Sequence, residues 1–219
     1  MLESIQLQTS TLVDYTVIWL HGLGADGHDF ESIVDELELP HTLGIRFLFP
    51  HAPMRSVTIN GGMRMRAWFD IESLELDQNL DLTGITKSAA QVTELIEREI
   101  SRGIPSTRIV LAGFSQGGLI ALHLGLRYSR PLAGIIALST YEPTLAHLTK
   151  DQIESNKATP IFIGHGSLDP VVPLHLGRAA CASLEKLGQK PDFHSYMMPH
   201  SVCPDEFRDI SQWLERCFA

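Results

Sequence analysis

Short apolar segments alternate with longer amphipathic ones along almost the whole chain. Six short segments are rich in β-branched or aromatic side chains and are bounded mostly by glycine, proline or histidine, which is typical of buried strands. The strands predicted in this way are residues 16–20, 45–49, 108–112, 134–138, 160–164 and 193–198.

Four longer segments have the pattern of helices. In the first, apolar residues recur at spacings of three and four from Ile85 to Ile100, and Gly103 followed by Pro105 ends the pattern. The second is apolar nearly all round, so we expect it to be buried on most sides. The second to fourth predicted helices are residues 119–128, 173–187 and 207–218.

Strands that alternate with helices predict an α/β fold with a mostly parallel central sheet and helices on both faces. A chain of 219 residues without internal repeats or linker-like tracts is expected to form one domain, residues 1–219. In such sheets the chemistry lies in the loops that leave the carboxyl ends of the strands, so candidate residues are sought there.

Charge and composition narrow the range of partners. The chain has 17 basic and 26 acidic residues, a net charge of −9, which disfavours nucleic acid and anionic membrane surfaces. No apolar run approaches the roughly 18 residues that cross a bilayer, and residues 1–8 lack a signal-peptide pattern. The three cysteines show no C-x-x-C spacing, so we expect free thiols, a cytoplasmic location and no stable membrane anchor.

The loop after the strand at 108–112 carries a candidate nucleophile. It reads Gly113-Phe-Ser115-Gln-Gly117 and leads directly into the second predicted helix. In a sharp strand-to-helix turn the backbone passes so close to the serine that side chains two residues before and after it would clash. The turn therefore predicts an exposed Ser115 at a helix N-terminus, where developing negative charge is stabilised.

A serine hydroxyl is a weak nucleophile without a base beside it. Of the ten histidines, His200 is the best candidate, because it lies between the strand at 193–198 and the last helix. His194 lies inside that strand and is expected to be structural, whereas His165 ends the preceding strand. Three further histidines are expected in or near helices on the surface: His123, His147 and His175.

A carboxylate must orient the base and stabilise its cation. Asp169 follows the strand at 160–164, although an Asp-Pro pair is also a common way to open a turn. Asp192 and Asp205 are weaker candidates because neither leaves the carboxyl end of a strand. The chain order serine, aspartate, histidine is the one found in α/β-hydrolases.

Two backbone amides are candidates for an oxyanion hole. The first predicted strand runs into His21-Gly-Leu-Gly24, where glycines on both sides of Leu23 allow its N–H to turn into the site. The second donor is the N–H of Gln116, directly after the candidate nucleophile. Removing one such donor typically costs about 3–4 kcal/mol of transition-state stabilisation.

Taken together, these segments resemble the carboxylesterase and acyl-protein thioesterase family of α/β-hydrolases over almost the whole chain. The resemblance is carried by residues 19–27, 49–53, 60–70, 113–118 and 165–173, and by His200. It implies a triad of Ser115, Asp169 and His200, with Leu23 and Gln116 as oxyanion donors. It also implies a cytoplasmic enzyme without cofactor or metal, and a possible homodimer.

One position departs from the family pattern. Members usually have glycine directly before the catalytic histidine, where this chain has Pro199. A proline there is expected to stiffen the loop and to shift His200 slightly.

The expected substrates are small esters or thioesters with short to medium acyl chains. Adaptable methionine and leucine side chains near aromatic residues suit an acyl groove. The candidate substrate-binding residues are Met65, Trp68, Leu74, Leu76, Phe114 and Val171. Trp68 and Phe69 could instead be ordinary core residues. Arg64 and Arg66 could bind an anionic headgroup of the substrate or form local ion pairs.

Other functions compete with a carboxylesterase. An acyl-protein thioesterase or lysophospholipase would use the same triad. A non-catalytic binding protein on the same fold would typically lack a triad residue, and none is missing here. A metalloenzyme is disfavoured because the chain has no H-E-x-x-H motif, and a dienelactone-type hydrolase would be expected to have cysteine in place of Ser115.

Overall fold

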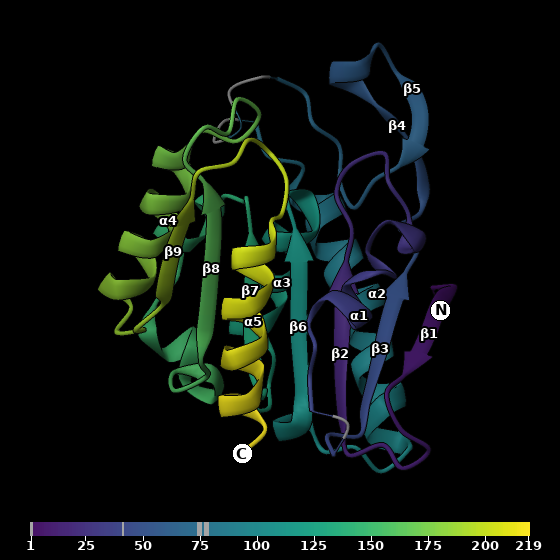
Figure 1. The fold of residues 1–219 in the computed structure, drawn as a ribbon. Coiled ribbons are helices and arrows are strands. Elements are labelled where there is room, and N and C mark those ends of the chain that lie inside the picture. Colours follow the sequence, from purple (N-terminus) through teal and green to yellow (C-terminus); the bar gives the residue numbers. More distant parts are fainter. Residues whose placement is uncertain (1, 41, 74–75, 77–78) are drawn as a thin grey trace.

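A seven-stranded sheet forms the centre of the computed structural model, which describes residues 2–40, 42–73, 76 and 79–219, without the side chains of residues 146 and 147. The strand order is β1-β3-β2-β6-β7-β8-β9, and only β1 is antiparallel to its neighbour (Figure 1). The strands are β1 (Ser4–Gln8), β2 (Tyr15–Leu20), β3 (Ile45–Pro50), β6 (Ile109–Phe114), β7 (Gly134–Leu138), β8 (Ile161–Gly166) and β9 (Asp192–Tyr196).

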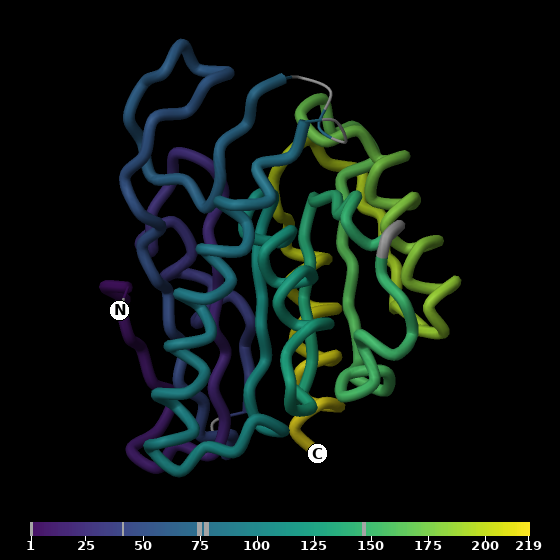
Figure 2. The backbone as a smooth tube through the Cα atoms, turned by 180° about the vertical axis from the view of Figure 1, so that it is seen from behind, coloured from purple at the N-terminus to yellow at the C-terminus, as the bar shows by residue number. Residues whose placement is uncertain are grey.

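Helices cover both faces of the sheet. Helices α2, α3 and α4 pack on one face, and α1 and α5 pack on the other (Figures 1 and 2). Their bounds are α1 (Ile33–Glu36), α2 (Leu82–Ser101), α3 (Gln116–Arg127), α4 (Leu174–Lys186) and α5 (Pro204–Cys217). Short 3-10 helices are η1 (Gly27–Phe30), η2 (Thr58–Asn60), η3 (Ser106–Arg108), η4 (Pro143–His147) and η5 (Lys150–Asn156).

The alternation of side chains along each strand divides the core into two parts. In β2, Ile18 and Leu20 belong to the cluster under α2 and α3, whereas Val17 and Trp19 belong to the cluster under α1 and α5. All four side chains are essentially inaccessible to solvent. Because both faces of a parallel sheet are covered, its inner strands are apolar throughout, which is the pattern that made them predictable.

The predicted α/β architecture is confirmed, and each of the six predicted strands overlaps an observed one. The four predicted helices are also present, with starts displaced by up to three residues. Helix α2 begins earlier than expected because the Asp81 side chain accepts a hydrogen bond from the Gly84 N–H at 2.7 Å and caps it.

Two strand regions were not predicted. Strand β1 is a half-exposed edge strand, and its Ser-Ile-Gln-Leu-Gln sequence contributes only two apolar side chains. The hairpin of β4 (Met54–Val57) and β5 (Met63–Arg66) projects beyond the carboxyl ends of the central strands (Figure 1). No strand was predicted in the stretch that contains β5. It forms a strand because η2, Gly61 and Gly62 reverse the chain, and both glycines have positive φ.

A buried carboxyl group lies between the sheet and α5. Glu206 is fully buried, and neither carboxyl oxygen has a hydrogen-bond partner within the described part of the chain. It packs so closely on β8 that a Cβ atom at Gly164 would overlap it. Burial raises the pKa of Glu206 to about 8, and the charge of Asp209 adds to the rise.

This carboxyl group makes stability pH-dependent. Between the ordinary glutamate pKa and about 8, the folded state keeps a proton that the unfolded state has lost, so stability falls as pH rises. The contribution is at most about 1.4 kcal/mol per pH unit. We expect Glu206→Gln to flatten the decline in the free energy of unfolding between pH 6.5 and 8, measured by urea denaturation.

The control is Glu215→Gln, an exposed position on the same helix. It should leave the wild-type slope unchanged. A Glu206→Gln protein with the same pH slope as wild type would show that Glu206 ionises in the folded state with an ordinary pKa.

Candidate active site

The turn between β6 and α3 holds Ser115 in a conformation that few residues other than glycine adopt, with φ at 53°. A Cβ atom at Gly113 would overlap the backbone of Gly117, and one at Gly117 would overlap the backbone of Leu20 and lie 2.6 Å from the His21 carbonyl oxygen. The two flanking glycines are therefore required by the backbone packing, as the sequence pattern predicted.

Hydrogen bonds to the neighbouring strand hold this strained turn in place. The Ser115 N–H donates to the Leu138 carbonyl at 2.8 Å, and the Thr140 hydroxyl donates to the Ser115 carbonyl at 2.6 Å. The N–H of Leu119 donates to the same carbonyl at 3.2 Å and begins the helical pattern of α3. With its backbone fixed on both sides, Ser115 presents its hydroxyl to the cavity.

The structure brings the three side chains of the predicted triad together. His200 Nε2 lies 3.0 Å from Ser115 Oγ, and His200 Nδ1 lies 2.7 Å from Asp169 Oδ2. The other carboxylate oxygen, Oδ1, accepts from the N–H groups of Val171 and Val172, each at 2.8 Å. Because a carboxylate accepts at Nδ1, that nitrogen carries the proton, and Nε2 is free to accept from Ser115.

The loop that carries His200 reaches Ser115 despite Pro199. The Leu168 N–H donates to the Met198 carbonyl at 3.1 Å, which ties the loops after β8 and β9 together. A Cβ atom at Gly166 would overlap the Pro199 carbonyl, so only glycine allows this approach. The expected shift of His200 does not separate it from Ser115 or Asp169.

His165 stabilises the turn that contains Asp169. It is fully buried at the end of β8, and its Nε2 donates to the Val172 carbonyl at 2.8 Å. The same nitrogen lies 3.7 Å from Asp169 Oδ2, and burial lowers the pKa of His165. A neutral His165 therefore closes the 169–172 turn without competing for the proton between Asp169 and His200.

His21 orients the loop that contains Leu23. The Ala52 N–H donates to His21 Nε2 at 3.0 Å, so Nδ1 carries the proton and donates to the Gly22 carbonyl at 2.7 Å. Burial lowers the pKa of His21 to about 4, which keeps it neutral. In a trans peptide the C=O of Gly22 and the N–H of Leu23 point in opposite directions, so this bond fixes the direction of that N–H.

The side chain of Gln116 binds a neighbouring loop, while its backbone begins α3. Its Oε1 accepts from the Trp68 N–H and its Nε2 donates to the Phe69 carbonyl, both at 2.7 Å. The Trp68 indole N–H in turn donates to the His21 carbonyl at 2.9 Å. These bonds link the nucleophile turn, the 67–69 segment and the loop after β2 into one unit.

Trp68 was expected to bind substrate, but it is not among the residues that line the cavity. Its side chain is fully buried, and its role is to hold the His21 carbonyl, as the alternative of a core position implied. Met65 is also absent from the cavity wall. It packs against Gly24, and its sulfur accepts a hydrogen bond from the Asn60 amide at 3.2 Å.

A cavity of about 290 Å³ opens beside Ser115 at the carboxyl end of the sheet. Three expected residues, Leu76, Phe114 and Val171, line it together with Leu23, Gln116, Ser115 and His200. The expected residue Leu74 lies outside the described residues. Six lining residues were not predicted to bind substrate: Gly22, Ala25, Asp29, Ile71, Tyr141 and Val172.

Comparison with known proteins identifies the family. The family model described as phospholipase/carboxylesterase matches residues 7–218. The chain belongs to the phospholipase/carboxylesterase family. It is therefore an α/β-hydrolase and a carboxylic ester hydrolase, as the sequence motifs implied.

Relatives of this family member include both sequences and solved structures. Acyl-protein thioesterase 1 from Neurospora crassa is 42% identical over 209 residues, which cover 91% of this chain and 85% of the relative. The crystal structure of Arabidopsis thaliana SOBER1 has a TM-score of 0.88 at 31% identity, over 94% of this chain and 99% of that one. Zea mays acyl-protein thioesterase 2 has a TM-score of 0.87 at 27% identity, over 100% of both chains.

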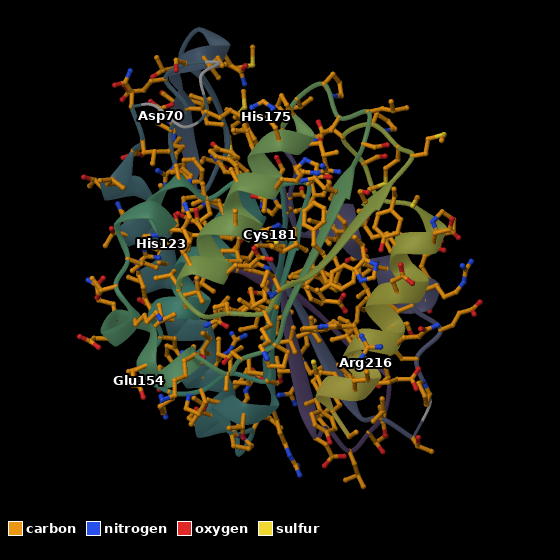
Figure 3. All side chains as sticks on the ribbon, turned by 90° about the vertical axis from the view of Figure 1, so that its left-hand side faces the viewer. Asp70, His123, Glu154, His175, Cys181 and Arg216 are labelled. Atoms are coloured by element: carbon orange, nitrogen blue, oxygen red, sulfur yellow. The ribbon has the colours of Figure 1, made fainter. Side chains whose placement is uncertain are left out.

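Other histidines of this hydrolase lie away from the cavity. His123 lies in α3 (Figure 3) and was expected on the surface. Its side chain is only 13% exposed, and its Nδ1 lies 3.2 Å from the Thr144 hydroxyl. Burial lowers its pKa to about 4. His194 has the expected structural place, with Asp192 at 2.8 Å and Asp209 at 3.4 Å.

Two weaker carboxylate candidates also lie apart from Ser115. Asp192 binds His194, and Asp205 pairs with Arg208 at 2.9 Å on the surface of α5. Arg66, for which an anionic headgroup or a local ion pair was expected, donates to the Ala52 carbonyl at 2.9 Å. Among the described residues no group of three or more histidine, cysteine or acidic side chains is arranged to hold a metal ion. In the same part of the chain, no helix has the length and apolarity to span a bilayer.

The backbone packing at the nucleophile turn leads to a direct prediction. Gly117→Ala forces the turn away from Leu20 and His21, and a displacement of about 1 Å typically costs about 100-fold in rate. We expect kcat for a soluble acyl ester to fall by about that factor, with the circular dichroism spectrum unchanged.

The matched control is Gly125→Ala in the same helix. Its Cβ atom would meet mainly the flexible end of the Ile135 side chain, so kcat should stay within about threefold of wild type while stability falls. Full activity of Gly117→Ala would contradict the role assigned to this close approach.

Proposed function

We propose that this hydrolase cleaves esters and thioesters of short to medium acyl chains through an acyl-enzyme on Ser115. The observation that carries the proposal is the hydrogen-bonded series from Asp169 through His200 to Ser115, which ends in an apolar cavity. A serine beside a neutral imidazole that is oriented by a buried carboxylate is the arrangement that activates a hydroxyl for acyl transfer.

In the proposed mechanism, Ser115 Oγ attacks the acyl carbonyl while His200 Nε2 takes its proton. Asp169 stabilises the resulting imidazolium, and its own position is held by the Val171 and Val172 N–H groups. His200 then returns the proton to the leaving alcohol or thiol. A water molecule, deprotonated by the same nitrogen, hydrolyses the acyl-enzyme and restores Ser115.

The oxyanion is assigned to the N–H groups of Leu23 and Gln116. Both residues line the cavity beside Ser115, and the Gly22 carbonyl is held away from the site by His21. The N–H of Gln116 lies in the first turn of α3, where the helix dipole favours negative charge. Such preorganised donors stabilise the developing charge without reorganisation during the reaction.

The size of the cavity is compatible with an acyl chain of short or medium length. Its volume of about 290 Å³ is at the lower end of the range for ligand pockets. Ile71, Leu76 and Val172 supply an apolar wall for the acyl group. A cytoplasmic location and a homodimer remain predictions of the family resemblance.

A second candidate function is removal of acyl groups from protein cysteines. It is supported by the names of the relatives from Neurospora crassa and Zea mays, which are acyl-protein thioesterases. Val171 at the cavity rim is 57% exposed, so the cavity is accessible from outside to a substrate attached to a larger molecule.

The proposal is tested with an octanoyl ester and an octanoyl thioester of matched size. We expect wild type to hydrolyse both, and Ser115→Ala to lower kcat/KM for both by at least about 10⁴-fold. Ser101→Ala, an exposed serine at the end of α2, should leave both rates unchanged.

Equal activity of Ser115→Ala and wild type would contradict the acyl-enzyme. If only the thioester is hydrolysed, the result favours a thioesterase function over a general esterase function. An S-octanoylated peptide hydrolysed faster than the small thioester would support the second candidate function.

A further inference from the structure

One ionisable side chain in the cavity wall has no place in the mechanism described above. Apart from His200, which is neutral when it accepts the Ser115 proton, Asp29 is the one charged residue among those that line the described cavity. It lies in η1, just after the loop that contains Leu23 and Ala25. The apolar wall formed by Ile71 and Leu76 comes from a different segment of the chain.

Ring contacts connect the short helix that carries Asp29 to the catalytic histidine. The ring of Phe30, its neighbour in the chain, lies 5.7 Å from the ring of Phe114, which lies 4.7 Å from the imidazole of His200. The general acid must face the group to which it gives its proton. An acyl chain favours the apolar side chains of Ile71 and Leu76, which leaves the wall that carries Asp29 for the departing alcohol or thiol.

Among the described residues, no cation forms an ion pair with this carboxylate. Within the described residues, Asp29 has no ion pair or side-chain hydrogen bond, and its backbone N–H donates to the Asp26 carbonyl. Desolvation raises the pKa of Asp29, and the charge of a second carboxylate, Asp26, raises it further. Two acidic groups thus add negative potential near this wall, in a chain of net charge −9.

We propose that Asp29 is a specificity-determining residue that selects the leaving group by charge, accepting neutral and cationic groups and rejecting anionic ones. The inference rests on the proposed acyl-transfer function and adds the chemistry of the group that Ser115 displaces. An anionic alcohol or thiol, such as one that carries a carboxylate or phosphate, is repelled as it approaches this wall. A cationic one is attracted by the same field.

The test uses three thioesters that share an octanoyl group and differ in the charge of the thiol. They are S-octanoyl-N-acetylcysteamine, which is neutral, S-octanoyl-3-mercaptopropionate, which is anionic, and S-octanoylthiocholine, which is cationic. The ratio of kcat/KM between Asp29→Asn and wild type is measured for each. Differences in intrinsic reactivity cancel in this ratio, because each substrate is compared with itself.

We expect Asp29→Asn to raise kcat/KM for the anionic thioester about tenfold, the effect of one unit-charge repulsion in a partly solvated cleft. It should leave the neutral substrate within about twofold and lower kcat/KM for the cationic one. In wild type, added salt should reduce the disadvantage of the anionic substrate, since exposed charges are screened. Asp29→Glu should retain the wild-type order.

Asp35→Asn removes the same charge from an exposed position on α1 and controls for the net charge of the protein. It should give equal ratios for the three substrates. Equal ratios for Asp29→Asn would overturn the inference while leaving the proposed function intact. A wild-type protein that hydrolyses none of the three would contradict the proposed function, and the inference with it.

Discussion

The close backbone approach around Ser115 determines where every other group of the site has to lie. The turn after β6 passes so near the end of β2 that only glycine fits at position 117, and Ser115 itself is held at positive φ. Such a conformation persists only when its surroundings determine it fully. Here the Leu138 carbonyl and the Thr140 hydroxyl do so, and both come from the neighbouring strand or directly after it.

Other loops at the same edge of the sheet are held by buried polar side chains that do not react. His21 directs the Gly22 carbonyl, the Gln116 amide binds the 68–69 segment, and His165 closes the turn that contains Asp169. Each of these side chains has a fixed donor and acceptor pattern, because burial keeps the two histidines neutral. The result is a set of loops held around a cavity that is lined mostly by apolar side chains and by one carboxylate, Asp29.

The sequence predicted the central strands and the three convergent side chains because both follow from strong local rules. Apolar runs identify buried parallel strands, and the carboxyl ends of such strands meet at one edge. The same reasoning missed β1 and the β4–β5 hairpin, because edge and projecting strands bury few side chains. Trp68 shows a second limit of prediction from sequence. An aromatic side chain in this segment is compatible with a substrate groove, but Trp68 is buried in the core and donates a hydrogen bond to the His21 carbonyl.

Asp29 could not be predicted as a cavity residue because no local pattern distinguishes it from Asp26, three residues earlier. Its place in the cavity wall follows from the tertiary fold, in which the neighbouring Phe30 lies against Phe114, a residue far away in the chain. The effect of Pro199 on the loop that carries His200 could not be predicted from the sequence either. It depends on the space that Gly166 leaves for the Pro199 carbonyl on the adjacent loop.

The central claim is that Ser115 is an activated nucleophile. It is tested most directly by the intact mass of the protein after exposure to a fluorophosphonate, with Ser115→Ala as the control. The account predicts one adduct on wild type, at Ser115, and none on the variant. A wild-type protein that forms no adduct, or a variant that forms the same adduct, would contradict it.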